Sequence, residues 1–416
     1  MRLALLPALL AAVLAAGASA QVCEGDVLLV NDGHVADFDC SEITGSLTIR
    51  RYVSDLAPLA KLTRVGGELT VEETVPLTTP TALASLEGLH NVTSVGGLVL
   101  HDNPSLTGLE GLRGLRHTGR LVISDCPRLE RLSGLDSLTT ILGELRITGL
   151  SSLTSLDGLQ GLVQIGGLEI GPGFPLPSLR GLDDLETIVG DLWVSGAVSL
   201  QSLDGLQGLR QIRGLRLYQT SLPSLVGLEG LRQIDGTLEI DEATGLTDLN
   251  GLQGLEGVGG DVVIRRNSAL HTLEGLSSLQ RAHGSVSISA NPALTTLQGL
   301  ERFEATVGDL HIHRNDALEA LTGLSALTHV GGSLRLRENP ALRRLDGIES
   351  LRSVGSHLIV KRNPALVECS CGTAGLVSDG AFSGVGVSAS FATNAPAPEG
   401  TCNSRPEVLA TPCPLP

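Results

Sequence analysis

Two histidines separated by one residue are the first candidates for chemistry in this sequence. His311 and His313 flank Ile312, and alternate residues of an extended strand point to the same side. Both imidazoles are therefore expected on one exposed face, with a spacing that suits two ligands of a metal ion. The matching positions of the neighbouring repeats hold only serine and arginine (Ser287, Ser289, Arg335, Arg337). Because arginine repels a cation and a third ligand is missing, we expect neither a metal nor another cofactor.

Acidic residues are the next candidates, because paired carboxylates can act as general acid and base. Glu169, Glu239 and Asp241 are expected on the same face, where some β-helical polysaccharide lyases carry their catalytic groups. They stand beside Arg146 and Arg216, and adjacent repeats give no tight acidic cluster. The sequence also has no Gly-x-Ser-x-Gly elbow, no His-Glu-x-x-His motif and no phosphate-binding glycine loop. These observations predict a solvated charged face and a protein that is not an enzyme.

The few aromatic residues indicate a binding surface. Aromatics make up 2% of the chain, which has a single Trp. Trp193 and Tyr218 fall one repeat apart and are displaced by two residues along the strand, with Arg216 beside them. Exposed aromatic and arginine side chains are common anchors of binding surfaces. Ordinary packing between neighbouring strands is the alternative.

Basic residues cluster in one part of an acidic chain. The formal net charge is −16, whereas residues 265–362 carry 12 Lys/Arg against nine Asp/Glu, a net +3. Equivalent positions just beyond successive strands read Arg265, Ser289, His313, Arg337 and Lys361, with Arg266, Arg314 and Arg362 beside them. We expect these side chains to form a basic stripe that attracts an acidic glycan or protein at low salt. A solvated face that balances acidic loops is the alternative.

A repeat of 24 residues must position all these side chains. Its marker is an asparagine that recurs at Asn267, Asn291, Asn315, Asn339 and Asn363, and a fixed period of this length indicates a stacked solenoid. Each repeat has a Leu-x-Leu/Ile core with the alternation of a half-buried strand. We predict fourteen such strands, with these central residues: Thr48, Thr70, Val99, Val122, Arg146, Glu169, Trp193, Arg216, Glu239, Val263, Ser287, His311, Arg335 and Ile359. Stacked at about 4.8 Å per strand, they would form a rod with one parallel ribbon.

The remaining recurrent positions predict how each turn is held. The asparagine is expected to turn inward and bond to main-chain groups, forming a ladder between turns. Cys126 occupies the same position and is predicted to be a buried thiol, whereas the ladder is interrupted at Leu150, Gly173, Ala197, Thr220 and Ala243. A glycine recurs in Leu-x-Gly-Leu at twelve turns, which indicates a positive φ or a close approach to the next turn.

The two ends of the chain differ from the repeats. Residues 1–20 have the composition of a secretory signal cleaved near Ala20, so a secreted or surface-located protein is expected. No later apolar stretch is long enough to span a membrane. We divide the rest into an amino-terminal cap (21–46), the repeat solenoid (47–366), with an insert near Pro76 and Pro80, and a carboxyl-terminal cap (367–416).

Cysteines are concentrated in the two predicted caps, which suits disulfides in an exported chain. Cys23 and Cys40 flank a strand-like segment and are expected to be joined. The carboxyl-terminal cysteines are expected to pair among themselves, with three connectivities left open: Cys369, Cys371, Cys402 and Cys413.

The pattern Leu-x-x-Leu-x-Gly-Leu, followed by Val/Ile-Gly-Gly-x-Leu-x-Ile and Asn-Pro-x-Leu, resembles the receptor L-domain repeat over about residues 23–413. The resemblance implies a mainly β, right-handed, leucine-rich-repeat-like parallel β-solenoid of about 14 turns of 23–24 residues, and a role in recognition or wall attachment without catalytic residues. Receptor L-domains occur in pairs around a cysteine-rich module, whereas this chain has one uninterrupted stack, so growth-factor binding is not implied.

Three functions are consistent with these observations. We expect a non-enzymatic recognition or adhesion module that presents its sheet to a protein or an acidic glycan at a cell surface. The alternatives are a carbohydrate-active β-helix enzyme and a purely structural wall or matrix protein. The negative net charge argues against nucleic-acid binding.

Overall fold

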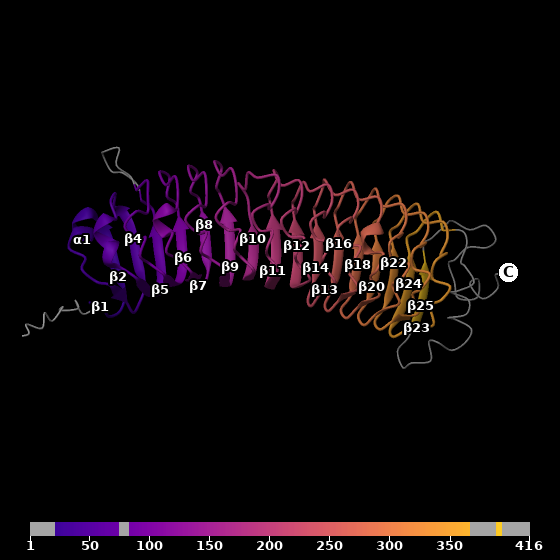
Figure 1. Cartoon of the computed structure of the whole chain (residues 1–416). Coiled ribbons are helices and arrows are strands. Elements are labelled where there is room, and N and C mark those ends of the chain that lie inside the picture. Colours follow the sequence, from indigo (N-terminus) through magenta and orange to yellow (C-terminus); the bar gives the residue numbers. More distant parts are fainter. Residues whose placement is uncertain (1–20, 75–82, 367–387, 393–416) are drawn as a thin grey trace, which may run out of the picture.

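A computed structural model of the chain describes residues 21–74, 83–366 and 388–392. The described chain winds into one parallel β-solenoid, seen in Figure 1 as a long, gently curved rod that runs from the indigo amino-terminal end to the yellow carboxyl-terminal end. The predicted signal sequence, the insert between residues 75 and 82, and most of the predicted carboxyl-terminal cap lie outside the described residues.

The main sheet runs the length of the rod and has the predicted register. Thr48 pairs with Thr70, and every predicted central residue pairs with the next as far as Arg335 and Ile359. The fourteen predicted strands are β4 (Leu47–Tyr52), β5 (Arg64–Glu72), β6 (Ser94–His101), β8 (Leu121–Ser124), β9 (Thr140–Thr148), β10 (Gln164–Ile170), β11 (Thr187–Ser195), β12 (Gln211–Tyr218), β14 (Leu238–Asp241), β16 (Val262–Arg265), β18 (Val286–Ser289), β20 (Leu310–His313), β22 (Leu334–Arg337) and β24 (His357–Lys361).

Two further strands extend this sheet. β2 (Val27–Asn31) pairs with β4 at the amino-terminal end, and β25 (Ser388–Ala392) pairs with β24 at the other end. The sheet therefore continues into residues 367–416, a segment for which the sequence predicts only a cap.

A second, shorter ladder differs from the prediction of one strand per turn. It includes β1 (Val22–Cys23), β3 (Glu42–Ile43), β7 (His117–Thr118), β13 (Gln233–Ile234), β15 (Gly257–Val258), β17 (Arg281–Ala282), β19 (Ala305–Thr306), β21 (His329–Val330) and β23 (Ser353–Val354). In β5, β6 and β9–β12 the same stretch is continuous with the main strand. The described helices are short: α1 (Asp32–Ala36) and the 3-10 turns η1 (Ala57–Lys61), η2 (Glu110–Leu112) and η3 (Glu274–Leu276). None of them has the length and apolar character needed to cross a membrane.

The core is a column of aliphatic side chains inside the solenoid. One turn buries seven of them almost completely: Leu200, Leu203, Leu206, Leu209, Ile212, Leu215 and Leu217. Since each contributes about 1.5–3 kcal/mol and packs on the turns above and below, the stack is stable although no single turn would be.

The corner glycines satisfy both expected requirements. Gly205 has a φ of +111°, and a Cβ there would lie 2.1 Å from the carbonyl oxygen of Leu179 in the preceding turn. Gly111, in η2, has no positive φ, yet its Cβ would lie 2.0 Å from the Leu86 oxygen. The close stacking of turns thus requires glycine at this corner even where φ does not.

The asparagine ladder is also confirmed. Asn267, Asn291, Asn315, Asn339 and Asn363 are fully buried. In each described step the side-chain Nδ2 donates to a strand carbonyl of the preceding turn, as from Asn291 to Ile264 at 3.0 Å, and Oδ1 accepts from a main-chain N–H. Asn103 extends the ladder, because its Oδ1 accepts from the Thr74 hydroxyl at 2.6 Å.

Cys126 and the residues predicted to interrupt the ladder occupy the ladder position, except at Gly173. Cys126 is a buried free thiol whose Sγ lies 3.4 Å from the Ser124 oxygen. Gly173, which the repeat places in the ladder, is exposed with a φ of +75°, and Phe174 is buried in its place. The turn at Pro172 therefore shifts the inward position by one residue.

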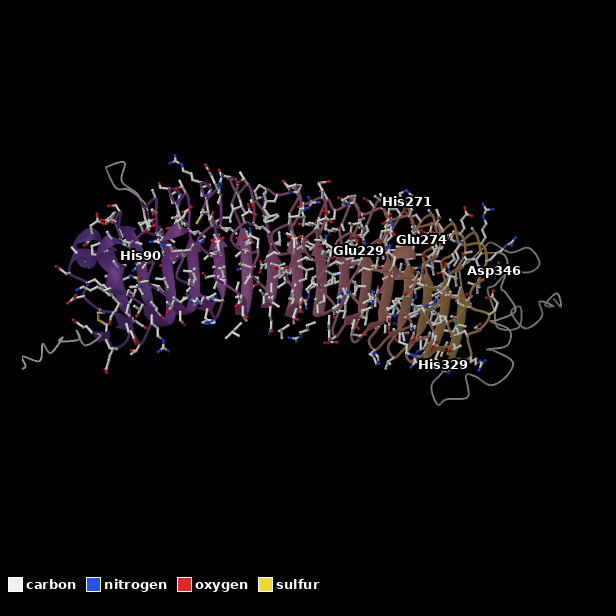
Figure 2. The ribbon with its side chains drawn as sticks, viewed as in Figure 1. His90, Glu229, His271, Glu274, His329 and Asp346 are labelled. Carbon is white, nitrogen blue, oxygen red and sulfur yellow. A yellow bond between two sulfur atoms is a disulfide. The ribbon has the colours of Figure 1, made fainter. Side chains whose placement is uncertain are left out.

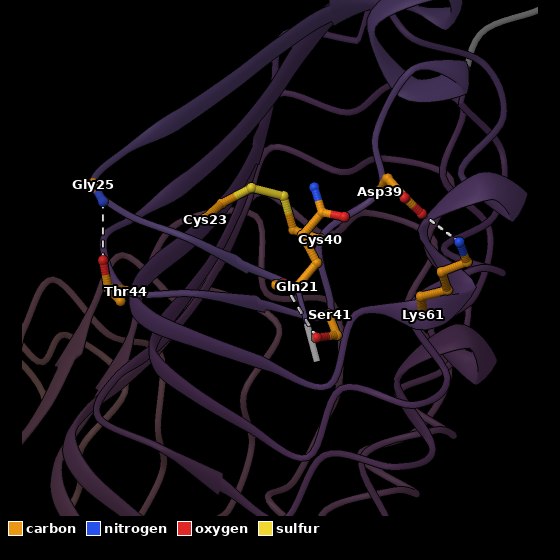
Figure 3. Close-up of a disulfide and its surroundings, with 8 residues drawn as sticks. All are labelled: Gln21, Cys23, Gly25, Asp39, Cys40, Ser41, Thr44 and Lys61. Carbon is orange, nitrogen blue, oxygen red and sulfur yellow. Dashed lines mark hydrogen bonds and ion pairs between the residues drawn. A yellow bond between two sulfur atoms is a disulfide. The ribbon is translucent and has the colours of Figure 1, made fainter. Parts of the chain in front are cut away.

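The amino-terminal cap is cross-linked as predicted. Cys23 of β1 and Cys40 form a disulfide (Figure 3). Around it, the Gly25 N–H donates to Thr44 Oγ1 at 2.9 Å and the Ser41 hydroxyl donates to the Gln21 oxygen at 3.2 Å. A disulfide is typical of proteins that fold in an oxidising compartment. The other predicted disulfides, among Cys369, Cys371, Cys402 and Cys413, lie outside the described residues.

Candidate binding surface on the main sheet

The exposed face of the main sheet carries parallel rows of side chains. The central row consists of the fourteen predicted residues from Thr48 to Ile359. We call the row two residues further along each strand the outer row. From β12 to β24 its members are in register: Tyr218, Asp241, Arg265, Ser289, His313, Arg337 and Lys361. The predicted stripe residues are therefore aligned as expected.

Ion pairs neutralise the amino-terminal end of this predicted basic stripe. Arg265 contacts Asp241 at 2.9 Å and Glu239 at 3.2 Å, and Arg266 also contacts Asp241. Asp241 is almost fully buried beneath the two guanidinium groups. These contacts hold the stripe's amino-terminal end in a structural network, so it contributes little free positive charge.

Glu338 has a similar effect at the other end. Its carboxylate accepts from Arg314 at 2.7 Å and from Arg362 at 2.9 Å. The three residues hold equivalent positions in consecutive turns, so the carboxylate lies between two cations, and these lower the pKa of Glu338. Arg314 and Arg362 thus belong to the stripe with their charges partly balanced.

Arg337 and Lys361 differ from the other basic residues of the stripe. Neither forms an ion pair with any carboxylate of the described residues, and the two lie side by side in register on β22 and β24. Arg337 Nε is shielded from solvent and has no hydrogen-bond partner among the described groups. These two side chains carry the positive charge that the surrounding carboxylates leave unbalanced.

A hollow of about 360 Å³ lies beside Arg337 on the sheet face. Its walls are His311 and His313 of β20, Arg335 and Arg337 of β22, and the following residues Arg314 and Glu338. With neutral histidines, the cations around it outnumber the carboxylates by three: Arg314, Arg335, Arg337, Lys361 and Arg362 against Asp309 and Glu338. The hollow is therefore electropositive in an otherwise acidic rod.

The two histidines line this hollow as neutral side chains. Burial and the nearby Arg335 lower the pKa of His311, and burial and Arg314 lower the pKa of His313. His311 Nε2 contacts Arg335 and lies 3.1 Å from Asp309, whose carboxylate also holds Arg335 at 2.8 Å. His311 and Arg335 thus both contact the carboxylate of Asp309, whereas His313 and Arg337 have no such carboxylate partner among the described residues.

The aromatic candidates lie further towards the amino-terminal end. Trp193 is 42% exposed and Tyr218 37% exposed. Trp193 pairs with Arg216, and Tyr218 pairs with Ser195 next to it, as the displacement by two residues predicts. Arg216 itself contacts Asp191 at 3.3 Å. Both aromatic rings are therefore partly exposed on the open sheet face.

A carboxylate pair next to this region was missed from the sequence. Glu169 accepts from Arg146 at 2.6 Å, and Glu144 lies on the adjacent strand β9. Burial and Glu169 raise the pKa of Glu144. The two glutamates come from different rows of adjacent strands, with Gly167 opposite Glu144, so a comparison restricted to the central row does not find them.

Other ionisable side chains lie around the rod rather than at one centre. Figure 2 shows His271 at one long edge and His329 at the opposite edge. Among the described residues, no group of three or more His, Cys, Asp or Glu side chains is arranged to hold a metal ion.

Comparison with known proteins adds no assignment. No protein-family model matches the chain, and no curated protein matches it. A function for this chain is therefore inferred from the solenoid and its surface.

Proposed function

We propose that this protein is an exported, non-enzymatic recognition module that binds an acidic glycan or protein at a cell surface. The observation that carries the proposal is a pair of cations that form no ion pair with any carboxylate of the described residues: Arg337, which lines the electropositive hollow, and Lys361, which lies beside it in register. The rest of the chain is strongly acidic, so an anionic partner is attracted to this end of the sheet and repelled elsewhere. The resemblance of the repeats to receptor L-domain repeats supports a recognition role.

The test is retention on an immobilised anionic polysaccharide as the ionic strength is raised. Arg337→Ser with Lys361→Ser should elute at clearly lower salt than the wild type, because these cations have no carboxylate partner among the described residues. Arg302→Ser with Arg352→Ser is the matched control, since it makes the same charge change at exposed sites away from the hollow. Equal elution of the wild type and both variants would contradict the proposal.

Glu144 and Glu169 favour a second candidate, a carbohydrate-active enzyme. A carboxyl group with a raised pKa, as for Glu144, next to a second carboxyl group suits a general acid and its partner, and Trp193 lies next to Glu169 in register. Release of new reducing ends from acidic or neutral polysaccharides, abolished by Glu144→Gln, would support it. We prefer recognition because Arg146 neutralises Glu169.

A further inference from the structure

The hollow beside Arg337 has donors on two adjacent strands and little to cover it. His313 lies opposite Arg337 in register, and Lys361 follows Arg337 on the next strand. On the other side of His313 the matching residue of β18 is Ser289, which is small and buried. Arg337 itself lines the open hollow, and its Nε, which is shielded from solvent, has no partner among the described groups.

We propose that this hollow is a subsite for one tetrahedral oxyanion, a sulfate or phosphate ester of the partner, bound by Arg337 and His313 together with uptake of a proton by His313. The inference rests on the proposed function, because the ester belongs to the acidic partner. A tetrahedral anion presents three outer oxygens and can meet donors from both strands at once, whereas a carboxylate presents two in one plane.

Proton uptake is expected from the groups that face His313. Its own strand contributes His311, and the next residue is Arg314; β22 contributes Arg337, followed by Glu338, and β18 contributes only the uncharged Ser289. Burial and the two arginines hold its pKa below the ordinary value, against the opposing effect of Glu338. An anion placed between His313 and Arg337 screens this repulsion and raises the pKa of His313.

Reciprocity then makes binding depend on pH. A ligand that raises the pKa of His313 must bind more tightly as pH falls through the histidine range. Asp309 and Glu338 do not contribute to this pH dependence. Hydrogen bonds and nearby cations lower the pKa of both carboxyl groups, so both stay ionised in the pH range where histidine titrates. A rise of one pKa unit on binding corresponds to about tenfold tighter binding.

The test uses dextran sulfate, dextran phosphate and carboxymethyl dextran, which share one backbone and differ in the anion. Affinities are measured at constant ionic strength for the wild type, His313→Gln, Arg337→Gln and the control His271→Gln. Sulfate keeps its charge between about pH 5.5 and 7.5, so a pH effect reports the protein. We expect dextran sulfate to bind the wild type and His271→Gln about tenfold more tightly at the lower pH.

The variants His313→Gln and Arg337→Gln distinguish the roles of the two residues in binding. His313→Gln should lose the pH dependence while keeping most of the affinity at the higher pH, and Arg337→Gln should bind about tenfold more weakly at both. At the higher pH, dextran phosphate against dextran sulfate decides which ester is preferred. NMR titration of His313 with inorganic sulfate is an independent readout, and it should show a rise in the pKa of that side chain.

Three results would overturn the subsite while leaving the proposed function in place: salt-sensitive binding with no pH dependence, an unchanged pH dependence in His313→Gln, or equal binding and pH dependence with carboxymethyl dextran. Absence of salt-sensitive binding to all three polymers would instead overturn the proposed function itself.

Discussion

Asn315 is bonded to the main chain of Asn291 in the preceding turn, and the other end of its amide binds the same turn at Ile288. Its Oδ1 accepts the main-chain N–H of Asn291 at 3.1 Å, and its Nδ2 donates to the carbonyl of Ile288 at 2.9 Å. The side chain is fully buried, so water cannot replace either bond. The same pair of bonds recurs along the ladder and fixes where each strand leaves the sheet.

We therefore predict that Asn315→Ala lowers the free energy of unfolding by about 1–3 kcal/mol, because two buried main-chain groups lose their partners. Asn91→Ala is the control, since that amide is exposed and its bond to the Ala60 carbonyl can pass to water. Chemical denaturation of both variants measures the difference. Equal losses of stability would show that the ladder bonds contribute little.

The residue just before each ladder position gives a second prediction. Ala290 has a φ of +55°, as do its equivalents Arg266 and Arg314 with similar values. This left-handed conformation costs a non-glycine residue about 1–2 kcal/mol, more than glycine loses in chain entropy. Ala290→Gly should therefore stabilise the protein by about 0.5–1 kcal/mol. Ala293→Gly, at a position without positive φ, should destabilise it; a loss of stability in both variants would refute the strain argument.

Cysteine chemistry tests the two ends and the ladder together. Burial raises the pKa of the Cys126 thiol to about 11, so iodoacetamide should label it only after unfolding. Peptide mapping without reduction should find Cys23 joined to Cys40, and the four carboxyl-terminal cysteines paired among themselves. Rapid labelling of Cys126 in the native protein, or a disulfide from it to a cap cysteine, would exclude a buried ladder thiol.

Glu144 predicts a pH dependence of stability. Its pKa in the folded protein is raised from 4.5, first by burial and then by Glu169, so the folded state carries a penalty at neutral pH that is relieved as pH falls towards that value. Glu144→Gln should raise stability at neutral pH by no more than about 0.5–1 kcal/mol, because the pair is partly solvated.

The gain from Glu144→Gln should shrink as the pH approaches the ordinary glutamate value. Glu186→Gln, at an exposed glutamate, should change stability little at any pH. Thermal melts of both variants at a series of pH values measure this. A gain in Glu144→Gln that is independent of pH would contradict a raised pKa of Glu144 in the folded protein.

The architecture was predictable because one period repeats with little variation. Each Leu-x-Leu core fixed the register of its strand, and all fourteen central residues pair as expected. β25 escaped prediction because it lies 31 residues beyond β24 in register, with Ala389 and Phe391 at the positions of Leu358 and Val360. The short second ladder was not predicted because its two-residue strands have too few residues to show an alternation of apolar and polar positions.

The ion pairs of the surface were harder to predict, although one signal was present. Arg314, Glu338 and Arg362 alternate in charge at equivalent positions, so their pairing can be inferred from the period alone. The period does not show how far a long side chain reaches. Arg265 and Arg266 bend back onto Asp241, whereas Arg337 has no such partner among the described residues, and only side-chain packing separates these cases.

Removal of one whole turn is the strictest test of the repeat. Deletion of residues 268–291 joins Asn267 directly to Pro292 and restores the Asn-Pro step of the ladder. β16 would then pair with β20, and the buried column would lose one layer. Because each turn contacts only its neighbours, we expect the shortened protein to unfold cooperatively with modestly reduced stability and to keep the basic hollow.

Deletion of residues 268–279 is the control, because it removes half a turn and puts Asn267 against Gln280, so the strands beyond it lose register. Circular dichroism melts of the two deletions should differ sharply; similar melts would mean that the turns are not the independent units that the ladder and the glycine corners indicate.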